Sequence, residues 1–315
     1  MRPLLLTVTV LALSACSSAI GSTPSLGEAT PSTTEPVTTT PDTTTPDATT
    51  VPDRPTTAPS STVDLPTTPP SGPDETVAEE PGEPTVPAGA TTVPVTPPDP
   101  PIVAVWQEDG PDTQRAQEHL YSLGFWLAEA NGEYGQTTTQ AVMAFQKYAG
   151  LTADGRLGPQ TADALNAVTE RPTGRSTGGT LVEVDKTRQL LFIVRDGRTE
   201  WVLNTSTGTE IPYREPDQNS PGEFIEDDSI TRTGVFAVNR QREEGWWEGD
   251  LGEIYRPKYF DGGIALHGSY NIPPYPASHG CVRLSIQAMD WIWAEDVVPM
   301  RTTVWVHGEI PPRDV

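Results

Sequence analysis

The chain has 315 residues and a formal net charge of −23 at pH 7, and this length allows two or three folded domains. It contains two cysteines, which excludes the disulfide framework of small secreted proteins. After residue 101 the chain holds 31 acidic residues against 18 basic ones, without a basic cluster, which argues against nucleic acid as a partner.

The N-terminus has the features of an export signal. An apolar run over Leu4–Leu13 is too short to span a bilayer and suits the core of a signal peptide. The run ends in Leu13-Ser14-Ala15-Cys16, which resembles a bacterial lipobox. The resemblance implies that 1–15 is a lipoprotein signal peptide and that Cys16 carries a diacylglycerol; the alternative is an ordinary secretory signal. We expect an exported protein, lipid-anchored at the outer face of the bacterial cytoplasmic membrane and reaching into the cell wall.

Residues 16–102 lack the apolar side chains that a core needs. Between Thr23 and Pro101 the chain holds twenty prolines, and twelve acidic residues against one basic residue. Proline removes hydrogen-bond donors, and this composition cannot bury enough apolar surface to fold. We expect a long, disordered, Thr/Pro-rich acidic linker, roughly 50 Å across as a coil, that carries the folded part into the wall.

Residues 103–170 are predicted to form a small domain of three helices. Asn131-Gly132-Glu133-Tyr134-Gly135 recurs 23 residues later as Asp154-Gly155-Arg156-Leu157-Gly158, and each glycine-rich turn precedes a helical pattern. Pro159 suits the first turn of the last helix. The repeat and its helices resemble the peptidoglycan-binding type 1 domain. We interpret His119 as a surface residue and expect the domain to act separately from the chemistry.

After a glycine-rich linker at 174–179, the hydrophobic pattern changes to a period of two, which predicts a mainly-β domain over residues 178–308. We expect a β-sandwich-like fold with one or two helices. Arg195-Asp196-Gly197 is typical of a hairpin turn. Ser285 is typical of a helix N-cap, for a helix over 286–297 that packs through one face, namely Ile286, Met289, Trp293 and Val297. The predicted strands are 181–184, 190–194, 200–203, 234–238, 254–260, 263–267 and 303–307.

Cys281 lies in a segment with the residue types of nucleophilic catalysis. It has no disulfide partner in the folded part, and its neighbourhood reads Ser278-His279-Gly280-Cys281-Val282-Arg283-Leu284, with His267-Gly268 fourteen residues upstream of the cysteine. A thiol needs a base to become nucleophilic, and glycine lets backbone amides approach an oxyanion. The alternative, an inert buried cysteine, does not explain the neighbouring histidines and glycines.

Together with Thr231-Arg232-Thr233-Gly234-Val235-Phe236, these residues resemble the signature of the YkuD-type L,D-transpeptidase catalytic domain. The resemblance implies that Cys281 is the nucleophile and His267 the proton donor and acceptor. It also implies that the carbonyl of Gly268 orients His267. The backbone amides of His279, Gly280 and Cys281 would form the oxyanion hole, and the side chain of His279 would support this region.

Other residues keep two interpretations. Arg283 could bind a substrate carboxylate or form a buried ion pair that holds the loop. Trp246 and Trp247 could line a substrate cleft or close an edge of the core. We interpret Ser278 as a hydrogen-bonding residue of the loop rather than a second nucleophile, and count all four as candidate substrate-binding residues. The acidic segment 217–228 matches nothing in the family signature.

The implied reaction is peptidoglycan cross-linking. Cys281 would attack the bond between the third residue of a tetrapeptide stem and its terminal D-alanine, and the amine of a neighbouring stem would resolve the thioester into a 3→3 cross-link. Water in place of the amine would give an L,D-carboxypeptidase. The remaining alternatives are a non-catalytic wall-binding lipoprotein and a cysteine peptidase acting on protein. Expected partners are peptidoglycan stem peptides, glycan and, through the lipid, the membrane; no metal or cofactor is expected.

Overall fold

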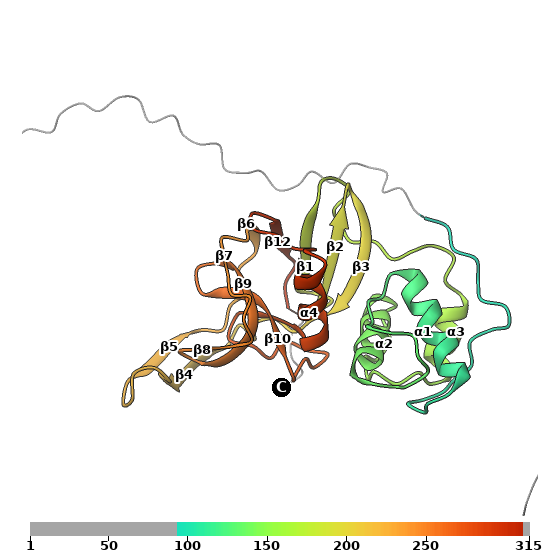
Figure 1. Ribbon diagram of the computed structural model, residues 1–315, viewed down its shortest axis with the longest axis horizontal. Helices are drawn as coiled ribbons and strands as arrows, with labels where there is room; N and C mark the ends of the chain where they lie inside the picture. The colour runs from blue at the N-terminus through green and yellow to red at the C-terminus, as the bar shows by residue number, and fades with distance from the viewer. Residues whose placement is uncertain (1–92, 311–315) are drawn as a thin grey trace, which may run out of the picture. The chain divides into compact units, whose positions relative to one another are not determined.

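The computed structural model describes residues 93–310 (Figure 1). The expected signal peptide, the lipidation site Cys16 and most of the expected linker lie outside the described residues. The last part of that linker, 93–102, packs against the helical domain. Ile102 is buried and exchanges hydrogen bonds with the side chain of Asn166, and the amide of Val95 donates to the carbonyl of Thr169.

The helical domain consists of α1 (Pro111–Leu123), α2 (Gln136–Tyr148) and α3 (Pro159–Asn166), which confirms the three predicted helices. A proline begins α1 and α3, where its missing N–H costs no helical hydrogen bond, and Gly124 ends α1 in the left-handed conformation. The prediction for His119 was wrong. It is buried, with Nε2 3.4 Å from the carbonyl oxygen of Leu165, and burial lowers its pKa.

The two copies of the glycine-rich repeat share one buried polar contact. In each, a buried glutamine from the preceding helix accepts a hydrogen bond from the turn glycine: Gln117 from Gly132 and Gln146 from Gly155, at 2.8 and 2.9 Å. Each glutamine also donates to a threonine in the following helix. The repeat therefore encodes one helix–turn–helix contact used twice.

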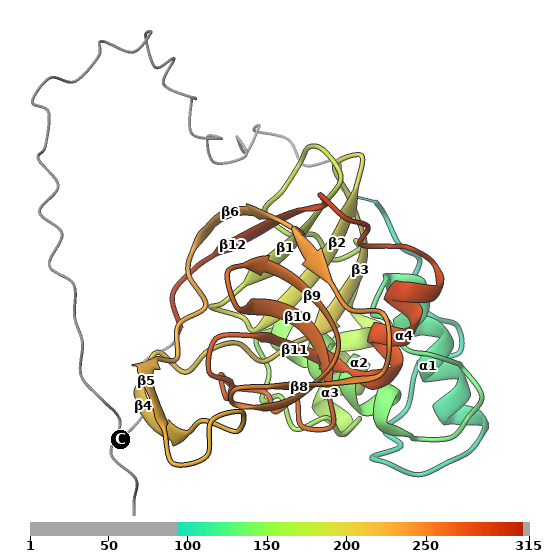
Figure 2. The ribbon, with the colours of Figure 1, turned by 60° about the vertical axis from the view of Figure 1, so that its left-hand side comes forward.

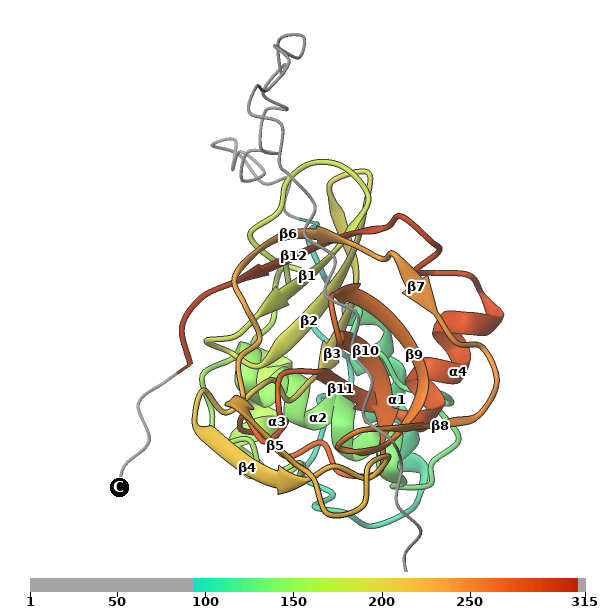
Figure 3. The ribbon, with the colours of Figure 1, turned by 90° about the vertical axis from the view of Figure 1, so that its left-hand side faces the viewer.

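The mainly-β domain contains two larger sheets (Figures 2 and 3). The first has five strands in the order β3-β2-β1-β12-β6, where β1 is Leu181–Asp185, β2 Leu190–Arg195, β3 Arg198–Asn204, β6 Gly234–Ala237 and β12 Thr303–His307. The second has the order β11-β10-β9-β7, with β8 also paired to β9, where β7 is Arg240–Gln241, β8 Trp246–Gly249, β9 Gly252–Asp261, β10 Ile264–Ser269 and β11 Val282–Ser285. All seven predicted strands are confirmed.

Five strands were not predicted: β7, β8, β11 and the separate hairpin of β4 (Pro212–Pro216) and β5 (Phe224–Asp228). The hairpin contains most of the acidic segment 217–228, which the sequence left unassigned. Its strands alternate between exposed and half-buried residues, so they carry no apolar face that a pattern could detect.

Helix α4 (Ile286–Ala294) packs against β9, β10 and β11 (Figure 2). The predicted cap is confirmed, since Ser285 Oγ accepts the amide of Ala288 at 3.1 Å. The predicted end at residue 297 was wrong, and the predicted face was confirmed only in part, since Met289 and Val297 are buried whereas Ile286 and Trp293 are half-buried. The helix ends at Ala294 and buries Ala288, Met289 and Ile292. Trp293 is half-buried, and its indole N–H donates to the carbonyl of Arg256 at 2.9 Å.

The first sheet is buried on both faces, which explains the unbroken apolar run Leu190–Val194. Leu191 and Ile193 pack in a core with the second sheet and α4. Leu190, Phe192 and Val194 share a second core with the helices, in which Phe125 and Phe145 meet edge to face at 5.5 Å. The helices and the first sheet therefore have one core in common.

Candidate active site

The parallel pairing of β10 with β11 brings the sequence motif together. His267 lies opposite Arg283 in the register, and Cys281 is two residues before Arg283, on the same side. A cavity of about 430 Å³ opens at this point. Its lining includes five of the predicted site residues and one of the two predicted tryptophans, namely His267, Ser278, His279, Cys281, Arg283 and Trp247.

His267 carries a buried, neutral imidazole. Its Nδ1 lies 2.9 Å from the carbonyl oxygen of Gly268, which only accepts, so Nδ1 carries the proton and Nε2 is left as an acceptor. Burial lowers the pKa of His267 to about 4, against the opposing effect of the Gly268 carbonyl. Only glycine fits at 268, because a Cβ there would lie 2.9 Å from the ring of Tyr255.

Cys281 is a free, half-buried cysteine. Its Sγ lies 3.8 Å from the carbonyl oxygen of Gly263. Burial raises the pKa of the thiol, while the backbone of Ala265 and the charge of Arg283 act in the opposite direction. The cavity therefore presents a neutral thiol and a neutral imidazole at rest.

Side chains hold the loop before Cys281 from two sides. Ser278 Oγ donates to the carbonyl of Cys281 and accepts the amide of Gly280 at 3.1 Å, while Thr231 Oγ1 donates to the carbonyl of Gly280 at 2.6 Å. This geometry adds no support to the predicted role of the Gly280 amide in the oxyanion hole, since that amide donates to Ser278 Oγ. Gly280 is instead required by its φ of 133° and by Ile230, whose carbonyl oxygen would lie 2.9 Å from a Cβ.

His279 contacts a strand that the sequence did not predict. Its Nε2 donates to Glu215 Oε1 on β4 at 2.9 Å, and its ring lies 4.6 Å from that of Tyr213. Neither partner carries a sequence signal, because β4 has no apolar pattern. The hairpin therefore supports the catalytic loop through this histidine.

Arg283 has no carboxylate within ion-pair distance anywhere in residues 93–310. The buried ion pair considered for it is thus wrong. Burial lowers the pKa of its guanidinium, which lines the cavity with Cys281. Its backbone is fixed by the segment after β3: its amide donates to the carbonyl of Ser206 at 3.0 Å, and its carbonyl accepts Thr205 Oγ1 at 2.8 Å.

The two tryptophans lie in different surroundings, and both are about 40% exposed, so neither closes the core. Trp247 lines the cavity, with the guanidinium of Arg242 4.1 Å from its ring. Trp246 stacks on Tyr270 with ring centroids 5.2 Å apart and is not part of the cavity.

The segment 205–208, Thr-Ser-Thr-Gly, was missed from the sequence and braces the site. Thr205, Ser206 and Thr207 are fully buried, and the carbonyl of Thr207 accepts the amide of Ser278 at 3.0 Å. A buried Ser/Thr run directly after a strand was the available signal. Across residues 93–310 there is no group of three potential metal-binding side chains, and no helix there is long and apolar enough to cross a membrane.

Comparisons with known proteins match both folded parts of the chain. The L,D-transpeptidase catalytic domain (YkuD) matches residues 179–306, and the peptidoglycan binding domain matches residues 109–165. The crystal structure of an L,D-transpeptidase from Xylanimonas cellulosilytica is similar over 68% of this chain and 98% of that chain, with 42% identity and a TM-score of 0.57.

Curated relatives match a shorter stretch. The N-acetylmuramoyl-L-alanine amidase CwlM of Mycobacterium tuberculosis is 37% identical over 65 residues, which is 21% of this chain and 16% of the relative. The amidase CwlL of Bacillus licheniformis is 42% identical over 65 residues, or 20% and 18%. The chain spans no more than a fifth of the length of the curated relatives it matches.

Proposed function

Because the chain belongs to the L,D-transpeptidase family, we propose that it forms 3→3 cross-links in peptidoglycan through an acyl-enzyme on Cys281. The observation that supports this most is the pairing of β10 with β11, which presents His267, Cys281 and Arg283 to one cavity. The acyl donor is a tetrapeptide stem, and the leaving group is its terminal D-alanine.

Acylation begins when the thiol of Cys281 attacks the carbonyl carbon of the stem's third residue. As the S–C bond forms, Nε2 of His267 accepts the thiol proton, and the backbone amides of His279 and Cys281 stabilise the oxyanion. The C–N bond then breaks, and the imidazolium returns the proton to the amine of the departing D-alanine. The product is a thioester, and its formation changes no oxidation state, so no oxidant or reductant is needed.

Deacylation repeats the chemistry with an amine. A side-chain amine of a neighbouring stem attacks the thioester carbonyl, and His267 accepts a proton from the amine. As the C–N bond forms, the C–S bond breaks and the imidazolium returns the proton to the sulfur of Cys281. Attack by water instead releases a tripeptide stem, which is the carboxypeptidase reaction. The guanidinium of Arg283 donates two hydrogen bonds to a carboxylate of the acyl-donor stem, and Trp247 packs against the bound stem.

Mass spectrometry of muropeptides tests the proposal. The purified chain is incubated with disaccharide-tetrapeptide, with Cys281→Ala as the control. Cross-linked dimers that contain one D-alanine less than two monomers support transpeptidation. Tripeptides alone identify the hydrolase, and an unchanged substrate identifies a non-catalytic binding protein.

Both matched domains act on the cell wall, which supports a location of the protein outside the cytoplasm. From the lipobox pattern alone we also propose that Cys16 carries the lipid that anchors the chain, since a diacylated cysteine holds a protein at a membrane. Cys16→Ala is expected to block normal processing of the signal peptide. A wild-type protein found wholly in the culture medium would contradict the anchor.

A further inference from the structure

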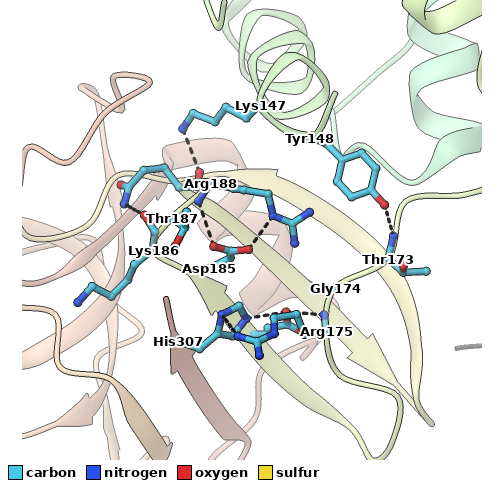
Figure 4. A network of polar contacts seen from close by, with 12 residues as sticks. Lys147, Tyr148, Thr173, Gly174, Arg175, Asp185, Lys186, Thr187, Arg188 and His307 are labelled. Atoms are coloured by element: carbon cyan, nitrogen blue, oxygen red, sulfur yellow. Dashed lines mark hydrogen bonds and ion pairs between the residues drawn. The ribbon is translucent and has the colours of Figure 1, made fainter. Parts of the chain in front are cut away.

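Lys147, at the end of α2 in the helical domain, reaches into the catalytic domain (Figure 4). Its Nζ donates to two backbone carbonyls there, those of Gln189 at 2.9 Å and Thr205 at 3.1 Å. No carboxylate in residues 93–310 lies within ion-pair distance of it. Burial lowers its pKa to about 7.

Both carbonyls belong to the frame of the catalytic loop. Thr205 Oγ1 donates to the carbonyl of Arg283 at 2.8 Å. The side chain of Gln189 exchanges two hydrogen bonds of 2.8 Å with Thr207, whose carbonyl accepts the amide of Ser278. Hydrogen bonds through Gln189 and Thr207 therefore connect Lys147 to Ser278. Hydrogen bonds through Thr205 alone connect it to Arg283.

Gln189 is held in a conformation that needs support. Its φ is 55°, a left-handed value that residues other than glycine rarely adopt without compensating contacts. Its carbonyl accepts both Lys147 Nζ and the amide of Thr205. A second side chain of α2 acts nearby, since Gln140 accepts a hydrogen bond from Asn204 at 2.7 Å.

An unpaired buried amine is costly for stability, and a methionine of similar length would fill the same space without that cost. The hydrogen bonds of Lys147, which a methionine could not make, fix the direction of two carbonyls. On this geometry, and resting on the proposed function, we propose that Lys147 is a positioning residue for catalysis. The helical domain thus completes the catalytic frame as well as binding the wall.

The test compares Lys147→Met with Lys147→Arg and with Arg115→Met in the purified full chain. Arg115 is the matched control, because its contacts, with Pro100, Pro101 and Asp112, all lie within the helical domain and its flank. Three quantities are measured: kcat and KM on a soluble disaccharide-tetrapeptide, the pH profile of Cys281 alkylation by iodoacetamide, and sedimentation with purified peptidoglycan.

In Lys147→Met we expect kcat to fall about tenfold while KM changes less than about twofold. Cys281 alkylation slows in parallel, whereas sedimentation with peptidoglycan stays unchanged. Lys147→Arg, which keeps the donors, recovers part of the loss, and Arg115→Met behaves like the wild type. If Lys147→Met does not fold, Gln140→Ala decides in the same assays with a smaller expected loss.

Wild-type kcat and alkylation in a folded Lys147→Met variant would overturn the proposal, as would an equal loss in Arg115→Met. The alkylation assay needs no muropeptide. It therefore tests the positioning role even if the wild-type chain proves inactive on the stem, an outcome that would count against the proposed function alone.

Discussion

Nε2 of His279 donates to Oε1 of Glu215 at 2.9 Å, across 64 residues of sequence. Glu215 lies on β4, in a hairpin that belongs to neither of the larger sheets. The contact ties this hairpin to the loop that carries Cys281. A histidine two residues from Cys281 is thereby fixed from outside its own loop, whereas His267 is fixed by the carbonyl of Gly268.

Glu215→Ala is expected to lower kcat by on the order of tenfold, because His279 and its backbone amide lose their orientation. Glu215→Gln keeps an acceptor oxygen and retains more activity. Unfolding temperatures change little, since both side chains are partly exposed and such pairs contribute little to stability. Glu226→Ala is the control on the same hairpin, where it removes only the exposed pair with Arg214. Equal losses in the Glu215 and Glu226 variants would show a general effect of the hairpin.

The pH–rate profile reports the state of His267. Because burial lowers the pKa of His267 to about 4, the imidazole stays neutral and able to accept a proton down to that pH. We expect kcat/KM to remain level from about pH 8 to about pH 5.5 and to fall only as His267 becomes protonated below that. An acid limb centred near the ordinary histidine pKa of about 6.5 would contradict a buried, neutral base.

Gly280→Ala is expected to remove activity and to destabilise the protein by about 2 kcal/mol or more. The φ of 133° disfavours any side chain, and the new Cβ would meet the side chain of Ile264 and the carbonyl of Ile230. Gly222→Ala separates these effects, since Gly222 also has a positive φ, 95°, but no atom within 4 Å of its Cβ position. That control should lose about 1 kcal/mol in chemical denaturation and keep full activity. Unaltered turnover in Gly280→Ala would contradict the claim that catalysis needs this loop conformation.

The common core predicts that the helical and catalytic domains unfold together. Phe125 is fully buried between Phe145 and the first sheet, so Phe125→Ala should lower the free energy of unfolding by about 3–5 kcal/mol. The helical signal in far-UV circular dichroism and tryptophan fluorescence should shift to lower denaturant by the same amount. Tyr275→Ala, at a residue 60% exposed, should cost less than about 1 kcal/mol. Two separate transitions would restore the picture of independent domains.

The sequence predicted those elements whose signals are local. The confirmed strands carry their own apolar residues in a local pattern or run, and Ser285 caps its helix with its own hydroxyl. The hairpin β4–β5 was missed because both of its faces are largely exposed, so no period exists to be detected. Residues Leu190–Val194 are buried on both faces of their sheet. Their sequence is an unbroken apolar run, which is typical of strands covered on both sides.

The partners of the catalytic loop could not be predicted for a different reason. Glu215 and Lys147 act through contacts that span 64, 42 and 58 residues of sequence, and neither residue type is unusual where it stands. The motif itself identified Cys281, His267 and Gly268, because its spacing reflects the parallel pairing of two neighbouring strands.

The central claim is an acyl-enzyme on Cys281 that depends on His267. Intact-protein mass spectrometry tests it most directly, with the wild-type chain, Cys281→Ala and His267→Ala each quenched in acid after mixing with disaccharide-tetrapeptide. The account predicts a wild-type adduct with the mass of the muropeptide minus D-alanine, mapped to Cys281. It predicts no adduct in Cys281→Ala and acylation at least about 100-fold slower in His267→Ala. An adduct on another residue, or unchanged acylation in His267→Ala, would contradict it.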